Sequence, residues 1–316
     1  MSEIGGYFSL ELSGGSEYHS SAVALNSARN AFEYVLEAKK YTKIHVPHFL
    51  CDSMLEPVLK LGVDIERYHI NPLLEVDVPV LTGSEAFLYV NYFGIKNSFV
   101  LSLSQQSRNI VIDNSQSFFT KKHEGVDTIF SPRKFFGVPD GGYLYTDVKL
   151  DRDLPQDISA DRFAHLLKRI EGGARHGYSD YLKCEKSLSE QPIRSMSALT
   201  RRILKSADYD YSRRVRNKNF CFLHEHLSSN NQLSGIIDIG AIDGPMVYPF
   251  LSENRRLKNK LLGKDVFVAT YWPEVVDNPD SSEFERHLAQ NLIAVPIDQR
   301  YSEDNLAHIL SILGII

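Results

Sequence analysis

Short apolar runs alternate with helix-like patterns along the first half of the chain. Such runs, bounded by glycine, proline or polar residues, are typical of strands. The sequence predicts strands over residues 43–47, 64–70, 86–94, 110–112, 127–131 and 143–146. Apolar residues recur at helical spacing between the early strands, most clearly after Asn26 and Ser27, either of which can cap a helix. This alternation predicts βαβ units and a largely parallel sheet.

The pattern changes in the last third of the chain. A long helical stretch over residues 211–227 carries several arginines, which we interpret as a solvated face. Beyond Gly244, the sequence predicts strands over 245–249, 266–272 and 291–296, with helices over 254–262 and 306–313. We therefore expect an α/β protein with a large domain of residues 1–205 and a small α+β domain of residues 206–316.

Bulk composition narrows the class of protein only slightly. The chain has 316 residues and a formal net charge of −5, and no basic run suggests a nucleic-acid or membrane-surface partner. No stretch reaches the roughly 18 apolar residues of a membrane span, and the N-terminus has no apolar signal segment. The three cysteines are widely spaced and form no metal-ligand pattern or disulfide framework. We expect a cytoplasmic protein with reduced thiols and no metal centre.

Candidate chemistry lies between residues 110 and 142. Asp113 directly follows an apolar run, and open α/β sheets bind ligands at the carboxyl ends of their strands. Lys134 stands between the next predicted strand and the pair Gly141-Gly142. Pyridoxal phosphate (PLP) needs a lysine amine for its Schiff base and an acid that faces the pyridine nitrogen. Asp113 and Lys134 are therefore candidates for these two roles.

A simpler interpretation of each residue stays open at this point. An aspartate after a strand is often a turn former or a helix cap, and a single lysine is usually a solvated charge. Ser27 can cap an ordinary helix, or it can begin a helix whose N-terminus binds an anion such as phosphate. Short motifs of this kind carry a false-positive risk.

The residues around Asp113 and Lys134 resemble the DegT/DnrJ/EryC1/StrS family of fold-type-I PLP enzymes, the sugar aminotransferases. That family carries an Asp-x-x-Gln box after a strand, which Asp113 and Gln116 match. It also has a lysine followed seven and eight residues later by Gly-Gly, as Lys134 is here. The resemblance implies PLP as the cofactor and a fold-type-I architecture, with a mostly parallel sheet in a large domain and a small C-terminal α+β domain.

The same resemblance implies further cofactor contacts. Ser27-Ala28-Arg29 resembles the family's Ser-Gly-Thr or Ser-Gly-Arg box, whose backbone amides bind the PLP phosphate. Ser131 lies three residues before Lys134, whereas family members commonly place a serine five residues before their lysine. Cys51 stands where the family commonly has an aromatic residue that stacks on the pyridine ring. Phe49 can replace that ring or belong to the core, and both interpretations stay open.

The resemblance implies a reaction, which is amino transfer from an amino acid, expected to be glutamate, to a keto-sugar, expected to be nucleotide-linked. Lys134 would hold PLP and move the donor's α-proton, Asp113 would stabilise the pyridinium, and Gln116 could bond the ring hydroxyl. A homodimer is expected because fold-type-I sites lie at a dimer interface. The family's loop asparagine, which reaches the neighbouring subunit's cofactor, is nevertheless absent near Arg194.

Other functions stay open beside amino transfer. A PLP-dependent lyase or dehydratase would use the same Asp113 and Lys134. A family member without catalysis could act as a binding protein. The departures at Ser131 and Cys51 and the missing loop asparagine favour this alternative slightly, and the retained lysine opposes it. An α/β protein without PLP is disfavoured by the combination of Asp113, Lys134 and Gly141-Gly142.

Overall fold

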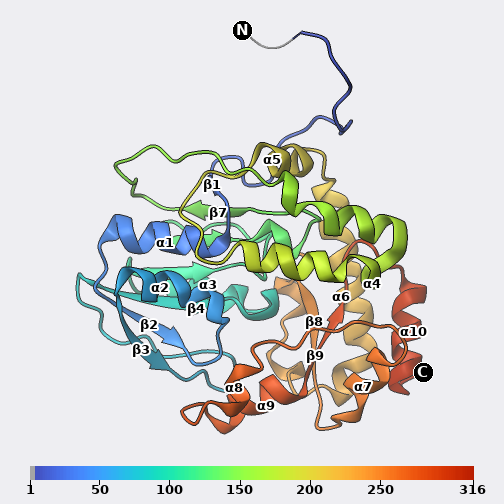
Figure 1. Ribbon diagram of the computed structural model, residues 1–316. Helices are drawn as coiled ribbons and strands as arrows, with labels where there is room; N and C mark the ends of the chain where they lie inside the picture. The colour runs from blue at the N-terminus through green and yellow to red at the C-terminus, as the bar shows by residue number, and fades with distance from the viewer. Residues whose placement is uncertain (1–3) are drawn as a thin grey trace.

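One large sheet forms the centre of the structure, a computed structural model that describes residues 4–316 (Figure 1). Its strands are β1 (Val23–Leu25), β2 (Lys43–Pro47), β3 (Asp64–Tyr68), β4 (Glu85–Val90), β5 (Ile110–Asp113), β6 (Asp127–Phe130) and β7 (Gly142–Tyr145). They follow the order β1-β7-β6-β5-β4-β2-β3. The pairs among β2 to β6 are parallel, and β7 runs antiparallel to its neighbours β6 and β1. The predicted, mostly parallel sheet is confirmed. β1 was not predicted.

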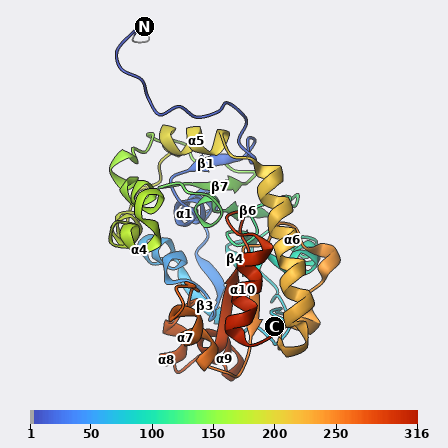
Figure 2. The same ribbon diagram turned by 90° about the vertical axis from the view of Figure 1, so that its right-hand side faces the viewer.

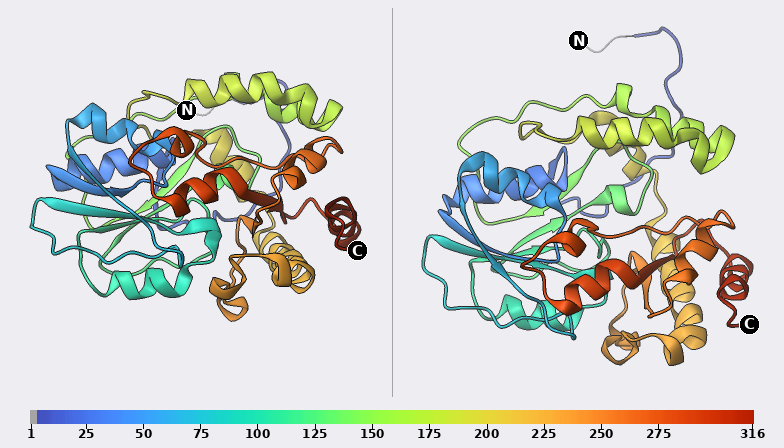
Figure 3. Two further views of the ribbon diagram at one scale, coloured as in Figure 1. Left: turned by 90° about the horizontal axis from the view of Figure 1, so that it is seen from below. Right: turned by 60° about the horizontal axis from the view of Figure 1, so that its bottom comes forward.

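Helices cover both faces of this sheet. α1 (Ala28–Lys39) and α2 (Glu56–Leu61) lie on one face, and α3 (Asn97–Ser104) lies on the other (Figure 3). α1 begins where the sequence predicts, because Ser27 Oγ accepts a hydrogen bond from Asn30 N (3.1 Å) and caps the first turn. The side chains of Phe32 and Val35 on this helix are completely buried. Because these two side chains pack in the core, they hold α1 and its N-terminus against the large sheet.

The segment α4 (Ala164–Ser187) is a pair of helical arms rather than one straight helix (Figure 1). The chain leaves helical geometry at Gly173, whose φ of 76° favours glycine. Lys168 Nζ on the first arm lies 2.6 Å from Asp180 Oδ2 on the second. The second arm then leads through residues 188–197 to α5 (Ala198–Lys205).

The C-terminal part is built on a two-stranded antiparallel sheet of β8 (Val247–Leu251) and β9 (Leu292–Pro296) (Figure 1). A long helix, α6 (Tyr209–Leu227), precedes it as predicted (Figure 2). The remaining helices are α7 (Arg256–Leu262), α8 (Glu274–Asp277), α9 (Glu283–Asn291) and α10 (Glu303–Leu313). This agrees with an α+β unit, while the exact division at residue 205 stays a prediction.

The strand predicted over residues 266–272 is wrong. This segment forms no ladder. Asp265, the residue just before it, and Trp272, its last residue, have φ angles of 60° and 51°. Trp272 instead packs edge-on against Phe49 of the large domain, with ring centroids 4.3 Å apart. One of the apolar residues that suggested a strand, Trp272, therefore packs between the large domain and the C-terminal part instead. None of the helices within residues 4–316 is long and apolar enough to cross a membrane.

Candidate cofactor site

Asp113 lies where the sequence places it, at the carboxyl end of β5. The neighbouring strand β6 runs parallel, with Asp113 opposite Ile129, so both strands end at the same edge of the sheet. The carboxylate is nearly buried, at 5% exposure, and its Oδ1 accepts a hydrogen bond from Ser115 N (2.8 Å). A charge at such an edge, away from bulk water, interacts strongly with a bound cation.

Lys134 ends a short 3-10 turn, Pro132–Lys134, just beyond the carboxyl end of β6. Its side chain is exposed, and within residues 4–316 no carboxylate lies within 4.0 Å of its amine. The residues beside it are held firmly: Arg133 pairs with Glu185 of α4, and Phe135 is buried. The turn is therefore fixed while the amine stays available.

The Gly141-Gly142 pair joins this turn to the start of α1. Gly141 has a φ of 123°, and its N–H donates to Asn26 O (2.8 Å). A Cβ on Gly142 would lie 2.4 Å from the carbonyl carbon and oxygen of Ser27 and 2.6 Å from Ala28 N. Only glycine permits this close approach of two backbones. The pair thus brings the N-terminus of α1 beside the lysine turn.

We predict that Gly142→Ala lowers the free energy of unfolding by roughly 1–3 kcal/mol, because the new methyl group must displace the backbone of Ser27. Urea denaturation measures this change. Gly235→Ala is the matched control: a Cβ there meets nothing within 4 Å, so its effect should stay within about 0.5 kcal/mol. Equal effects of the two substitutions would contradict the packing described for Gly142.

The N-terminus of α1 is suited to bind a phosphate. Ser27 Oγ takes the N–H of Asn30, and a parallel bridge between Ser27 and Gly141 engages the backbone around Ala28. The N–H of Arg29 falls in the first turn and has no acceptor within the helix. Such a group, together with the helix dipole, favours an anion. The guanidinium of Arg29 pairs with Glu56 (2.5 Å). The backbone N–H of Arg29 is therefore better placed than its side chain to bind a phosphate.

Gln116 is oriented by the short 3-10 turn Tyr92–Gly94 that follows β4. Its Oε1 accepts a hydrogen bond from Phe93 N (2.6 Å), and Phe93 itself has a φ of 59°. The side-chain oxygen is therefore occupied, and the NH₂ group remains as the donor for an acceptor at this edge. The contact of this group with the ring hydroxyl of PLP stays a prediction.

The stacking role considered for Phe49 does not fit the structure and is corrected. Its ring has 0% exposure and lies between Tyr92 and Trp272, and its carbonyl accepts a hydrogen bond from the Tyr92 hydroxyl (3.0 Å). A ring enclosed in this way presents no face to a ligand, so the alternative interpretation of Phe49 as core holds. Ser131, at 6% exposure, precedes the lysine turn, and its contact with the phosphate stays a prediction.

Two residues without a predicted role in binding the cofactor, Asp140 and the candidate cap Asn26, connect the parts of this site. Asp140 is completely buried and accepts hydrogen bonds from Ser197 N (2.9 Å) and Ser197 Oγ (2.7 Å) at the start of α5. Asn26 accepts from Arg194 N (3.2 Å) and donates to Pro192 O (3.1 Å). Because Asp140 directly precedes Gly141-Gly142, the sequence could have marked it as a candidate site residue. Its role depends on its hydrogen bonds to Ser197, and the sequence does not show that α5 lies beside it.

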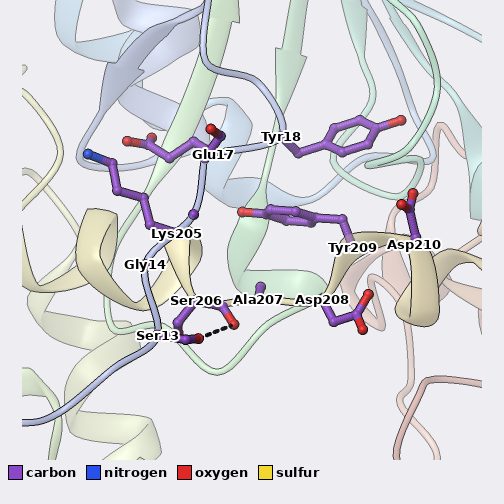
Figure 4. A pocket seen from close by; sticks show the side chains of 12 residues that line it. Ser13, Gly14, Glu17, Tyr18, Lys205, Ser206, Ala207, Asp208, Tyr209 and Asp210 are labelled. Carbon is purple, nitrogen blue, oxygen red and sulfur yellow. Dashed lines mark hydrogen bonds between the residues drawn. The ribbon is translucent and has the colours of Figure 1, made fainter.

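A separate cavity of about 490 Å³ lies between residues 13–18 and the connection from α5 to α6 (Figure 4). Glu17, Tyr18 and Tyr209 are among its lining residues, and Glu17 is already paired with Arg201 (2.9 Å). None of the predicted cofactor residues lines this cavity. It is therefore distinct from the site at the carboxyl edge of the sheet.

The chain shares its fold with sugar aminotransferases. It is similar to a DegT DnrJ EryC1 StrS aminotransferase from Brucella abortus, with a TM-score of 0.61 and 16% identity, covering 93% of this chain and 85% of that one. It is also similar to the sugar aminotransferase CalS13 from Micromonospora echinospora, with a TM-score of 0.65 and 13% identity over 93% and 87% of the two chains. A third similar structure is GDP-4-keto-6-deoxymannose-3-dehydratase (ColD) with bound GDP-perosamine, with a TM-score of 0.63 and 14% identity over 92% and 88%.

No family model matches the sequence, and no curated protein sequence matches it. The similarity to solved structures therefore establishes the fold, which is that of the fold-type-I aminotransferases. The fold expected from Asp113, Gln116 and Lys134 is confirmed.

Proposed function

We propose that this protein is a PLP-dependent aminotransferase. The observation that carries the proposal is the meeting of three groups at one edge of the sheet: the buried carboxylate of Asp113, the exposed amine of Lys134 and the open N-terminus of α1. These groups suit the pyridine nitrogen, the aldehyde and the phosphate of PLP. The shared fold supports the same assignment.

Each of these residues has a separate task in the proposed reaction. PLP, when bound, supplies a ring that withdraws electrons from the bonds at the donor's α-carbon. Lys134 would hold the cofactor through its amine, and the free amine would move the donor's α-proton as a general base and acid. Asp113 would keep the pyridine nitrogen protonated, and the NH₂ of Gln116 would donate to the ring hydroxyl. The backbone at the start of α1, residues 27–29, would bind the phosphate.

The proposed amino donor is an amino acid, with glutamate as the first candidate, and the proposed acceptor is a nucleotide-linked keto-sugar. Support for a sugar comes from the relatives in fold, one of which is a sugar aminotransferase and another of which holds GDP-perosamine. The substrate class therefore rests on the shared fold together with the PLP site.

A half-reaction tests the proposed activity. Glutamate added to the PLP form should replace the visible absorbance of Lys134-bound PLP with that of pyridoxamine phosphate and release 2-oxoglutarate. A keto-sugar nucleotide should then restore the first spectrum. If glutamate and other common amino donors all leave the spectrum unchanged while the protein still binds ligand, amino transfer is wrong and a binding protein is favoured.

A PLP-dependent dehydratase is the second candidate, because ColD has the same fold with a similar TM-score. The two reactions differ in what they release. A dehydratase or another lyase would consume a sugar nucleotide and release water, ammonia or a cleaved product without net transfer of nitrogen to the sugar. Mass spectrometry of the sugar product after incubation with ¹⁵N-glutamate separates them, because only amino transfer places the label in the product.

We propose that the protein works as a homodimer. The amine of Lys134 and the neighbouring Gly137 are exposed in the single chain, so the site lies open on one side, and a second copy is the simplest cover for it. Light scattering at micromolar concentration should give twice the mass of one chain. A monomer that binds PLP and turns over substrate would contradict this proposal.

A further inference from the structure

Phe135, the residue directly after Lys134, is held by the C-terminal part of the chain. The guanidinium carbon of Arg216, on α6, lies 4.4 Å from the centre of the Phe135 ring. Gln299, which follows β9, donates from Nε2 to Phe135 O (2.9 Å). The ring face and the backbone carbonyl of the same residue are thus both fixed from outside the large domain.

Arg216 is an unusual residue for a protein core. It is 2% exposed, and its Nη1 donates to the carbonyl oxygens of Pro245 and Met246 (both 3.1 Å). Its Nε donates to Gln299 Oε1 (3.1 Å), so the two residues that hold Phe135 also hold each other. Burial lowers the pKa of Arg216 to about 10, against an opposing contribution from Asp298, whose carboxylate is engaged by Arg300.

A buried guanidinium of this kind is costly, since within residues 4–316 it makes no ion pair and only neutral groups accept its hydrogen bonds. A methionine or leucine would fill the same space at a lower cost. Other contacts around the lysine turn belong to the large domain: Arg133 pairs with Glu185, and the Phe135 ring packs against Phe118 and Phe119, with ring centroids 5.6 and 5.9 Å apart. Arg216 and Gln299 therefore connect this turn to the C-terminal part.

We propose that Arg216 and Gln299 are positioning residues for Lys134. Through Phe135 they fix the backbone from which the lysine amine extends, so that movement of the C-terminal part changes the position of the amine. The catalytic meaning of this connection rests on the proposed function, whereas the mechanical connection itself does not. Neither residue touches a reacting atom.

The mechanical connection is tested without cofactor, by hydrogen exchange of the apo-protein followed by mass spectrometry. The amides of Phe135 and Phe136 bond to Pro132 O (3.0 and 2.8 Å), so they report on the turn. In Gln299→Ala, exchange in a peptide covering residues 131–138 should become about tenfold faster, as expected when one hydrogen bond is lost. Exchange across α1 should not change. An unchanged rate in residues 131–138 overturns the proposal, whether or not the protein binds PLP.

The chemical consequence is tested on the PLP-loaded protein. The pH at which the visible band of Lys134-bound PLP changes should shift in Arg216→Met and in Gln299→Ala, and Arg216→Lys should restore part of the shift, because lysine keeps a cation over the Phe135 ring. Arg214→Lys is the matched control, since Arg214 is exposed on the same helix and lies over Tyr211 (5.9 Å). An unshifted profile in Gln299→Ala would contradict the positioning role, even if Arg216→Met fails to fold.

A failure of the proposed function gives a different pattern of results. If the wild-type protein takes up no PLP at Lys134, the enzyme assignment fails, while hydrogen exchange still decides the mechanical connection. If PLP binds and exchange in the turn is unaffected by Gln299→Ala, the connection fails and the enzyme assignment stands.

Discussion

Replacing Lys134 with alanine is expected to reduce amino transfer by at least about 10³-fold. The substitution removes the group that we propose to hold PLP and to move the donor's α-proton, and proton transfer by a positioned side chain alone contributes roughly 10²- to 10⁴-fold. Because Lys134 is exposed and makes no ion pair within residues 4–316, its loss should leave the unfolding free energy almost unchanged. Steady-state turnover and urea denaturation of the same preparation measure the two quantities.

Lys205→Ala provides the control for this experiment. Lys205 is also exposed, but it ends α5 and lies away from the lysine turn, so its removal should change turnover by less than about twofold. Retention of a tenth or more of the wild-type activity by Lys134→Ala would show that another residue does this work. A large loss of stability in that variant would show that Lys134 has a structural role instead.

The second large effect is expected at Asp113. Asp113→Asn should slow removal of the donor's α-proton by roughly 10²- to 10⁴-fold with little change in KM, because the carboxylate acts mainly when electrons flow into the cofactor ring. The fold should persist, since an asparagine oxygen can still accept the hydrogen bond from Ser115 N (2.8 Å). Stopped-flow absorbance during a single turnover with glutamate measures the rate.

Asp64→Asn is the matched control for the carboxylate. Asp64 begins β3 and is exposed, so it lies at the amino end of a parallel strand, opposite to the edge that carries Asp113. Its substitution should leave the single-turnover rate unchanged. Similar rates for Asp113→Asn and the wild type would place the pyridine nitrogen elsewhere and remove one of the three groups that define the site.

Much of the large domain could be predicted from sequence because its strands are buried on both faces. Residues 110–112 and 127–130 consist almost entirely of apolar or β-branched residues, since helices cover the sheet on each side. The Gly141-Gly142 pair was also informative, and the structure adds its physical reason: a side chain at Gly142 would collide with the backbone at Ser27. The sequence pattern predicted the structure at these places because burial of a strand and close backbone packing each leave a mark on neighbouring residues.

Contacts between distant segments could not be predicted in this way. The apolar residues of 266–272 satisfy a strand pattern, yet Trp272 packs against Phe49, more than two hundred residues earlier in the sequence. Phe49 was left open between stacking and core for the same reason, because its burial depends on that partner. The three residues of β1 lie in a Gly- and Ser-rich stretch, and they become a strand by pairing with β7 at the end of the sheet.

Attachment of PLP to Lys134 is the central claim, and one measurement tests it most directly. The protein is incubated with excess PLP, its visible absorbance is recorded, and borohydride is added before proteolysis and mass spectrometry. We predict a visible band that borohydride removes, together with a phosphopyridoxyl group on the peptide that contains Lys134. Absence of the band, or attachment to any other lysine, would contradict the account.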